Sequence, residues 1–160
     1  MSRPGFVVEV PVQAPARAVW EGLVDWERQG EWVVGTRVHV LSQGGRGVGA
    51  LIEAVTGLGP VGVRDVFEIE EWDPPHRCVV RHLRRLVRGP AAFEVVPEGP
   101  GRSRIVWWEA LEPPFGPLGR LVWPVVERLL ARGFDRSLRT FARQVADRHA
   151  AGATDVGGGR

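Results

Sequence analysis

Three ionisable side chains, Asp65, His82 and Glu109, occupy positions from which they could do chemistry together. Their segments, "VRDVFEIEEW", "RCVVRHLRR" and "SRIVWWEALE", alternate apolar and polar residues as half-buried strands do. Each of the three is in phase with apolar neighbours on its own strand: Phe67 and Ile69, Cys78 and Val80, and Ile105 and Trp107. We expect all three to face an interior, where they bind a polar ligand head, perform acid–base catalysis, satisfy one another or lie at a solvated rim.

Other kinds of site lack the residues they need. Cys78 is the only cysteine, and no Cys/His cluster or metal-binding triad is present, so we predict no metal site. Ser42 and Ser103 have no His/Asp setting that would activate a nucleophile. The stretch "GGRGVG" lacks the GK[ST] ending of a phosphate loop and lies between strands. It therefore predicts a hairpin turn, and no cofactor is expected.

The arginines predict a basic face on a helix and do not indicate a nucleic-acid-binding site. The isoelectric point is near 9.8 although the formal net charge is only +2, because all 21 basic residues are arginine and tyrosine is absent. Five arginines fall within an arc of about 80° on an ideal helix: Arg128, Arg132, Arg136, Arg139 and Arg143. This face is either solvated or binds anionic lipid or an acidic partner. No nucleic-acid-binding motif accompanies it, so a nucleic-acid partner is not expected.

The order of elements predicts an α+β domain. "FVVEVPVQAP" is a first strand, and a short helix follows over Ala16–Asp25, with a second helical turn through "ERQGEWV". From Arg37 the period returns to two and predicts six further strands separated by turns such as "GGRG" and "DPP". The "TGLGPVG" loop, with Gly57, Gly59 and Gly62, is a turn or a movable gate.

The last part of the chain, from about Pro117, has helical periodicity with two apolar arcs that face different directions. One arc holds Leu118, Leu121, Val122, Val125 and Leu129, and the other holds Leu130, Phe134, Leu138, Phe141 and Val145. A straight helix cannot turn both arcs to one core, so we predict a kink or two segments, nearer Gly133 than Pro124. We expect a single domain over residues 1–150 and a disordered tail over 151–160.

Two tryptophans lie close together in the polar stretch "VDWERQGEWV". Trp26 and Trp32 could border the mouth of a cavity, with their apolar bodies inside and the neighbouring charges in water. The alternative is that both rings plug the core at that end of the fold. The spacing leaves both interpretations open.

The segments "VEVPVQAPARAVWEGLVDWERQGEWV", "FEIEEWDPPHRCVVRH" and "GRSRIVWWEALEPP" resemble the SRPBCC superfamily over about residues 5–148. These START-like or Bet v 1-like proteins include polyketide cyclases, lipid-transfer domains and many bacterial members. The resemblance implies a helix-grip fold, in which a seven-stranded antiparallel curved sheet wraps a long C-terminal helix and two short helices follow the first strand. It also implies a cavity between sheet and helix. The strand phases and this cavity together give these candidate ligand-binding residues: Trp26, Trp32, Asp65, Phe67, His82, Phe93, Trp107, Glu109, Phe134 and Leu138.

The expected function is binding of a hydrophobic or amphipathic small molecule, such as a lipid, a polyketide or an isoprenoid-like compound. The first alternative is an enzyme similar to polyketide cyclases or dehydratases, although the chain has no tyrosine and carries Glu70 and Glu71 where those enzymes suggest an arginine. The second is an interaction module that uses the arginine face. No leader or membrane-spanning stretch is recognisable, so we expect a cytoplasmic protein, with peripheral contact to anionic membranes as an option. The oligomeric state is left open between a monomer and a homodimer.

Overall fold

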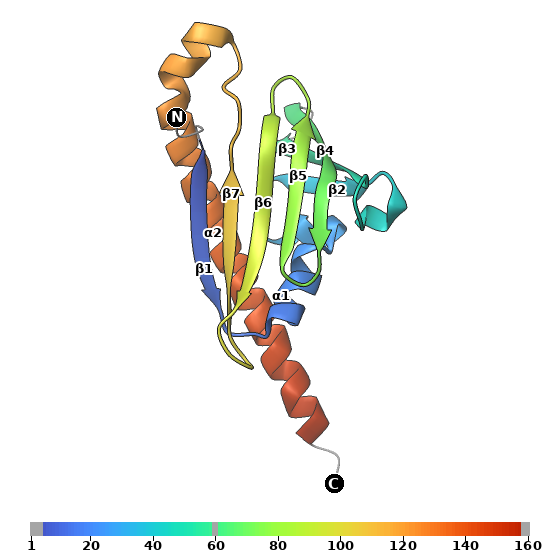
Figure 1. Cartoon of the computed structure of the whole chain (residues 1–160). Helices are drawn as coiled ribbons and strands as arrows, with labels where there is room; N and C mark the ends of the chain where they lie inside the picture. Colours follow the sequence, from blue (N-terminus) through green and yellow to red (C-terminus); the bar gives the residue numbers. More distant parts are fainter. Residues whose placement is uncertain (1–4, 59–60, 158–160) are drawn as a thin grey trace.

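The computed structural model describes residues 5–58 and 61–157 and has the predicted helix-grip architecture (Figure 1). Its strands are β1 (Phe6–Val12), β2 (Thr36–Val40), β3 (Leu51–Leu58), β4 (Val61–Asp73), β5 (Arg77–Leu83), β6 (Arg88–Pro97) and β7 (Ser103–Glu109). Its helical elements are α1 (Ala16–Leu23), the 3₁₀ turns η1 (Trp26–Glu31) and η2 (Gln43–Gly45), and α2 (Gly116–Gly157). The strands form one antiparallel sheet in the order β1-β7-β6-β5-β4-β3-β2.

The sheet is built from strands that bury alternate residues. In β1, Val8, Val10 and Val12 are buried while the residues between them are exposed. This period of two gives the sheet one face for the core and one for solvent. Because β1 and β2 lie at opposite edges, α1 and η1 cross the concave side to connect them, and Trp20 of α1 packs there against Phe93 at a ring distance of 5.4 Å.

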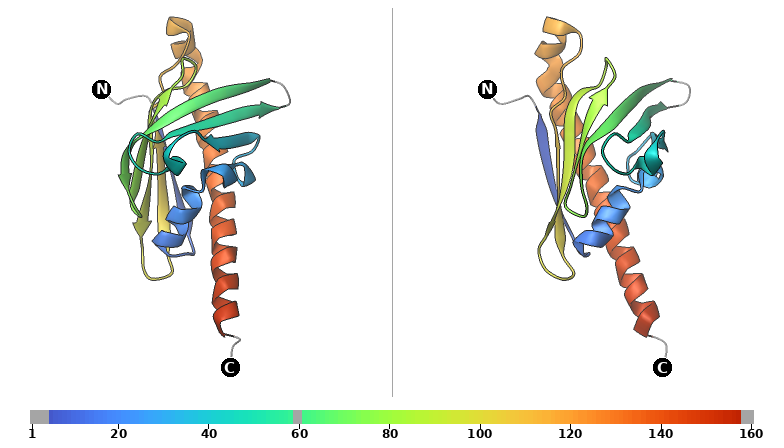
Figure 2. Two further views of the ribbon diagram at one scale, coloured as in Figure 1. Left: turned by 90° about the vertical axis from the view of Figure 1, so that its right-hand side faces the viewer. Right: turned by 45° about the vertical axis from the view of Figure 1, so that its right-hand side comes forward.

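The sheet curves strongly on the side of β3 and β4. The pairing of β4 with β5 shifts register between Ile69 and Glu71, which is a bulge that bends the strand. The β3–β4 hairpin projects away from the other strands and towards the side on which α2 lies (Figure 2). Because the bulge follows Ile69, the alternation predicted for Asp65, Phe67 and Ile69 is preserved. The predicted gate glycine Gly59 lies outside the described residues, whereas Gly57 and Gly62 pair with each other in the hairpin.

For the last part of the chain the sequence predicts a kink or two segments, and the second of these alternatives is wrong. Helix α2 is one element from Gly116 to Gly157, continuous through Gly133 and Pro124 (Figure 2). The second apolar arc is turned to the sheet, with Leu138, Phe141 and Val145 buried. The first arc is exposed, and its members are 52–76% accessible: Leu118, Leu121, Val122, Val125 and Leu129.

The reasons for this difference are direction and length, because on one continuous helix the two arcs face different ways. A helix of 42 residues is about 63 Å long, whereas a strand of 10 residues such as β6 spans about 34 Å. The sheet can therefore cover only part of α2, and both arcs do not need to face one core. The helix also continues through residues 151–157, where the sequence predicts a disordered tail; residues 158–160 lie outside the described part.

Candidate functional site

A cavity of about 1020 Å³ lies between the concave face of the sheet and α2. Its walls are mostly apolar, with Trp26, Phe67, Phe93 and Trp107 among the larger side chains. Exposed apolar residues continue the lining outwards: Val34, Val63, Leu86 and Leu129. The cavity is therefore an apolar space that opens to the surface between α2, the β3–β4 hairpin and the turn between β5 and β6.

Aromatic rings make one wall of the cavity rigid. Phe93 of β6 stacks on Trp107 of β7 with ring centroids 5.7 Å apart, and Trp107 stacks on Phe134 of α2 at 5.3 Å. Phe134 in turn contacts Phe6 of β1 at 5.6 Å. This chain of rings joins three strands to the helix, and it presents flat apolar surfaces to a ligand.

Asp65 and His82 meet at one place in the cavity wall. Asp65 lies on β4 and His82 on the neighbouring β5, where it is opposite Phe67. The Nδ1 atom of His82 is 2.6 Å from Oδ2 of Asp65, and the two side chains are only 10% and 14% exposed. Burial lowers the pKa of His82, but the hydrogen bond and charge of Asp65, with the charge of Glu109, outweigh it, so the pKa is raised.

Glu109 of β7 is the third polar group of this wall and is 5% exposed. Its Oε1 accepts a hydrogen bond of 3.0 Å from the indole Nε1 of Trp107. Burial raises the pKa of Glu109, and the charge of Asp65 acts in the same direction, whereas His82 and the Trp107 hydrogen bond oppose them. We call Asp65, His82 and Glu109 the polar cluster; all three line the cavity, as the strand phases predict.

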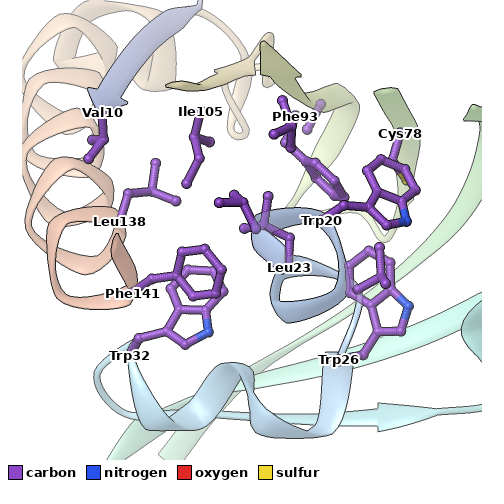
Figure 3. Packing of buried hydrophobic residues seen from close by; sticks show 14 of the residues in the cluster. Val10, Trp20, Leu23, Trp26, Trp32, Cys78, Phe93, Ile105, Leu138 and Phe141 are labelled. Atoms are coloured by element: carbon purple, nitrogen blue, oxygen red, sulfur yellow. The ribbon is translucent and has the colours of Figure 1, made fainter. Parts of the chain in front are cut away.

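The other candidate ligand-binding residues divide into two groups. Trp26, Phe67, Phe93, Trp107 and Phe134 line the cavity. Trp32 and Leu138 are buried in the hydrophobic core and are not among the residues that line the cavity. Trp32 packs on Phe141 of α2 at a ring distance of 5.0 Å, as Figure 3 shows.

The two tryptophans of "VDWERQGEWV" thus have different positions. Trp26 lies between the cavity and a smaller surface hollow of about 460 Å³, and its Nε1 donates to the carbonyl oxygen of Gly45 at 2.7 Å. Figure 3 shows Trp26 and Trp32 on separate sides of the buried cluster. Trp26 borders the cavity, whereas Trp32 is packed in the core.

Sequence reasoning missed several lining residues. Trp123, Val126 and Leu129 of α2 line the cavity, although the periodicity places Leu129 in an arc that predicts core packing. Thr36 and Thr56, whose hydroxyls lie 2.8 Å apart, also line it. Thr36 and Thr56 face each other across the paired strands β2 and β3. That pairing could have identified them, but it depends on a strand register that the sequence does not specify.

The remaining predicted residues lie outside the cavity or at its edge. Arg128, Arg132, Arg139 and Arg143 are exposed on α2, while Arg136 is exposed and also lines the cavity. His39, His76 and His149 are exposed, as expected, and Cys78 is fully buried. Within residues 5–58 and 61–157, no group of three or more His, Cys, Asp or Glu side chains is arranged to hold a metal ion. No helix of this described part combines the length and apolar character that a membrane span requires.

Solved structures with the same fold include proteins that bind or convert small molecules. The Zhui aromatase/cyclase of Streptomyces sp. R1128 superposes with a TM-score of 0.74 at 18% identity, over 90% of this chain and 94% of that chain. A START superfamily protein from Mycobacterium smegmatis gives 0.72 at 14% identity, over 88% and 98%. Norcoclaurine synthase from Thalictrum flavum, in complex with dopamine and hydroxybenzaldehyde, gives 0.67 at 17% identity, over 91% and 87%.

A comparison with curated proteins found no match. The family model described as polyketide cyclase / dehydrase and lipid transport matches residues 3–146, which is most of the chain and includes every residue of the polar cluster. The helix-grip sheet, the long C-terminal helix and this match agree with the resemblance of the three sequence segments. The chain belongs to the polyketide cyclase/dehydrase and lipid transport family of the SRPBCC superfamily.

Proposed function

We propose that the protein binds a hydrophobic or amphipathic small molecule, such as a lipid, a polyketide or an isoprenoid-like compound, in the cavity between the sheet and α2. The observation that carries the proposal is the cavity of about 1020 Å³ with its apolar, aromatic lining. Pockets for small molecules commonly enclose about 300–1,000 Å³ and combine apolar walls with a few polar groups. The family description, which includes lipid transport, supports the same class of ligand.

The test is a titration with N-phenyl-1-naphthylamine, an uncharged probe that fluoresces in apolar surroundings. Ala54→Asp adds a carboxylate to the cavity lining, and ligand binding would have to desolvate it. We expect at least about tenfold weaker probe binding in this variant, since about 1.4 kcal/mol corresponds to tenfold. The matched control is Ala151→Asp, at an exposed position of α2. Equal probe affinity in the two variants would contradict the proposal.

A second candidate is an enzyme similar to polyketide cyclases or dehydratases. It is favoured by the polar cluster, because a buried His82 held by Asp65 beside a carboxyl of raised pKa is suited to moving a proton. Glu70 and Glu71 take no part in it, since they are exposed and pair with Arg81 and Arg77. In an enzyme, Asp65→Asn, His82→Gln and Glu109→Gln would abolish turnover of a polyketide substrate and leave most of the affinity for N-phenyl-1-naphthylamine.

A third candidate is contact with an anionic membrane through α2. Arg128 and Arg132 are exposed there, and the exposed apolar arc that begins at Leu118 lies on the same face of an ideal helix. Sedimentation with phosphatidylglycerol vesicles tests this candidate, and Arg128→Glu with Arg132→Glu would reduce the bound fraction if it is correct. Unchanged sedimentation of that variant would reject it. The cytoplasmic location and the monomeric or homodimeric state stay predictions.

A further inference from the structure

Most polar groups of the cavity wall already have hydrogen-bond partners within the protein. The hydroxyls of Thr36 and Thr56 bond to each other, the amide of Gln29 donates to the carbonyl oxygen of Leu23 at 3.3 Å, and Trp107 donates to Glu109. Groups like these can line a cavity without requiring a polar ligand. They leave few positions at which a ligand could be recognised by hydrogen bonding.

The polar cluster contains atoms without a partner. Among residues 5–58 and 61–157, Nε2 of His82 and Oδ1 of Asp65 are buried and find no hydrogen-bond partner, and Nε1 of Trp123 on α2 is in the same situation. An unpaired buried polar atom costs about 1–3 kcal/mol, so a group that satisfies it on binding gains that amount. Nε2 of His82 differs from the other two atoms, because an imidazole nitrogen can either donate or accept.

The contact with Asp65 determines which nitrogen of His82 is available. An ionised carboxylate only accepts hydrogen bonds, so the Nδ1 atom at 2.6 Å carries the proton that Oδ2 of Asp65 accepts. This fixes the ring and leaves Nε2 as the buried nitrogen without a partner in a side chain that lines the cavity. When His82 is neutral, Nε2 accepts from a hydroxyl; when His82 is cationic, Nε2–H donates to an oxyanion. An oxygen acid on the ligand matches both states, because its proton can lie on either side of the hydrogen bond.

We propose that the polar cluster selects ligands that carry an ionisable oxygen (a phenol, an enol or a carboxylic acid) bound to Nε2 of His82, with the apolar body of the ligand against the aromatic wall. This inference rests on the proposed ligand binding and names the class of ligand. Ligands without such an oxygen leave Nε2 desolvated and unpaired. Ethers and esters of the same shape can accept from a cationic His82 but cannot donate to a neutral one.

Glu109 supports this preference. Burial raises the pKa of its carboxyl and so opposes its ionisation. A ligand oxygen that becomes negative then meets the His82–Asp65 pair beside a carboxyl that burial disposes to take up a proton. The cluster therefore tolerates the ionised form of a weak acid inside an apolar cavity.

The experiment compares three probes of nearly equal apolar shape: naphthalene, 1-methoxynaphthalene and 1-naphthol. Their dissociation constants come from displacement of N-phenyl-1-naphthylamine. We expect 1-naphthol to bind about ten- to a hundredfold more tightly than 1-methoxynaphthalene, which is the range for one buried hydrogen bond to a group that is or becomes charged. In the double variant Asp65→Leu with His82→Phe, both partners become apolar, a change that can be nearly neutral for folding, and the preference for 1-naphthol disappears.

A second measurement does not depend on a variant that must fold. In ¹⁵N-labelled native protein, the Nε2 resonance of His82 moves when 1-naphthol is added and moves little with 1-methoxynaphthalene. The exposed imidazoles of His39, His76 and His149 are internal controls and stay unchanged. Equal affinity for the two probes, or an unchanged Nε2 resonance at saturation with 1-naphthol, would overturn the inference alone. Failure of all three probes and of N-phenyl-1-naphthylamine to bind would overturn the proposed function as well.

Discussion

Two substitutions of Gly133, by alanine and by tryptophan, should both stabilise the protein, but only the second should weaken ligand binding. Gly133 lies in α2 and lines the cavity, and a Cβ atom there would meet nothing within 4 Å apart from its chain neighbours and the nearby backbone of its own helix. Glycine inside a helix costs about 1 kcal/mol relative to alanine, so Gly133→Ala raises the free energy of unfolding by about 1 kcal/mol. For a chain of this size, that corresponds to a rise in Tm of about 2–4 °C. The methyl group leaves the cavity open, so probe affinity stays unchanged.

Gly133→Trp keeps about half of the gain in stability, because tryptophan is a weaker helix former than alanine. Its ring packs on the apolar lining of the cavity mouth. If it covers about 100 Å² that the ligand would otherwise contact, the loss at about 25 cal/mol per Å² is about 2.5 kcal/mol. Binding of N-phenyl-1-naphthylamine should then weaken by between ten- and a hundredfold.

The assays are thermal unfolding followed by circular dichroism and a fluorescence titration of each variant. Ligand binding in the cavity is refuted if Gly133→Trp binds the probe as tightly as Gly133→Ala while both variants are folded and more stable than the parent. That result would mean that the probe binds outside the cavity. A loss of stability in Gly133→Ala would separately contradict the open space around this glycine.

Three further predictions concern pH, reactivity and packing. The pKa of Glu109 is raised in the folded state, so its contribution to stability is full below the unfolded pKa of about 4.3 and is lost as pH rises through the folded pKa. Glu109→Gln should therefore flatten the fall of Tm over this pH window. Coincident curves of Tm against pH for the two proteins would contradict this. Burial raises the pKa of Cys78 to about 12, so a thiol reagent at pH 8 should label this cysteine only after the protein unfolds. Rapid labelling of the native protein would contradict this prediction. Leu138→Ala should lower the free energy of unfolding, measured with denaturant, by about 2–5 kcal/mol. Leu118 is 73% exposed on the same helix, so Leu118→Ala should change this free energy by less than about 0.5 kcal/mol. Similar losses in the two variants would argue against the orientation of α2.

The sequence predicted the strands and the facing of the polar cluster because both depend on local alternation. Asp65, His82 and Glu109 each follow the phase of apolar neighbours, and that phase survives in the structure since the bulge in β4 lies after Ile69. A bulge two residues earlier in β4 would have turned the side chain of Asp65 to the opposite face of the sheet. The sequence alone could not locate it.

The arrangement of α2 could not be predicted for a different reason. Periodicity shows that a helix has two apolar arcs, but it does not show how much of the helix a sheet will cover. Leu138 and Leu118 have the same side chain on one helix, and only the first is buried, because the two arcs face different directions and the sheet covers only part of the helix. Trp26 and Trp32 illustrate the same limit, since tertiary packing on Phe141 makes Trp32 a core residue.

Native mass spectrometry of the gently purified protein tests the central claim most directly. We predict discrete complexes whose mass exceeds that of the denatured chain by one small molecule, either as purified or after addition of 1-naphthol. The same addition to Gly133→Trp should give a markedly smaller bound fraction than addition to Gly133→Ala. A native mass equal to the bare chain at every ligand concentration, or equal bound fractions in the two variants, would contradict ligand binding in the cavity.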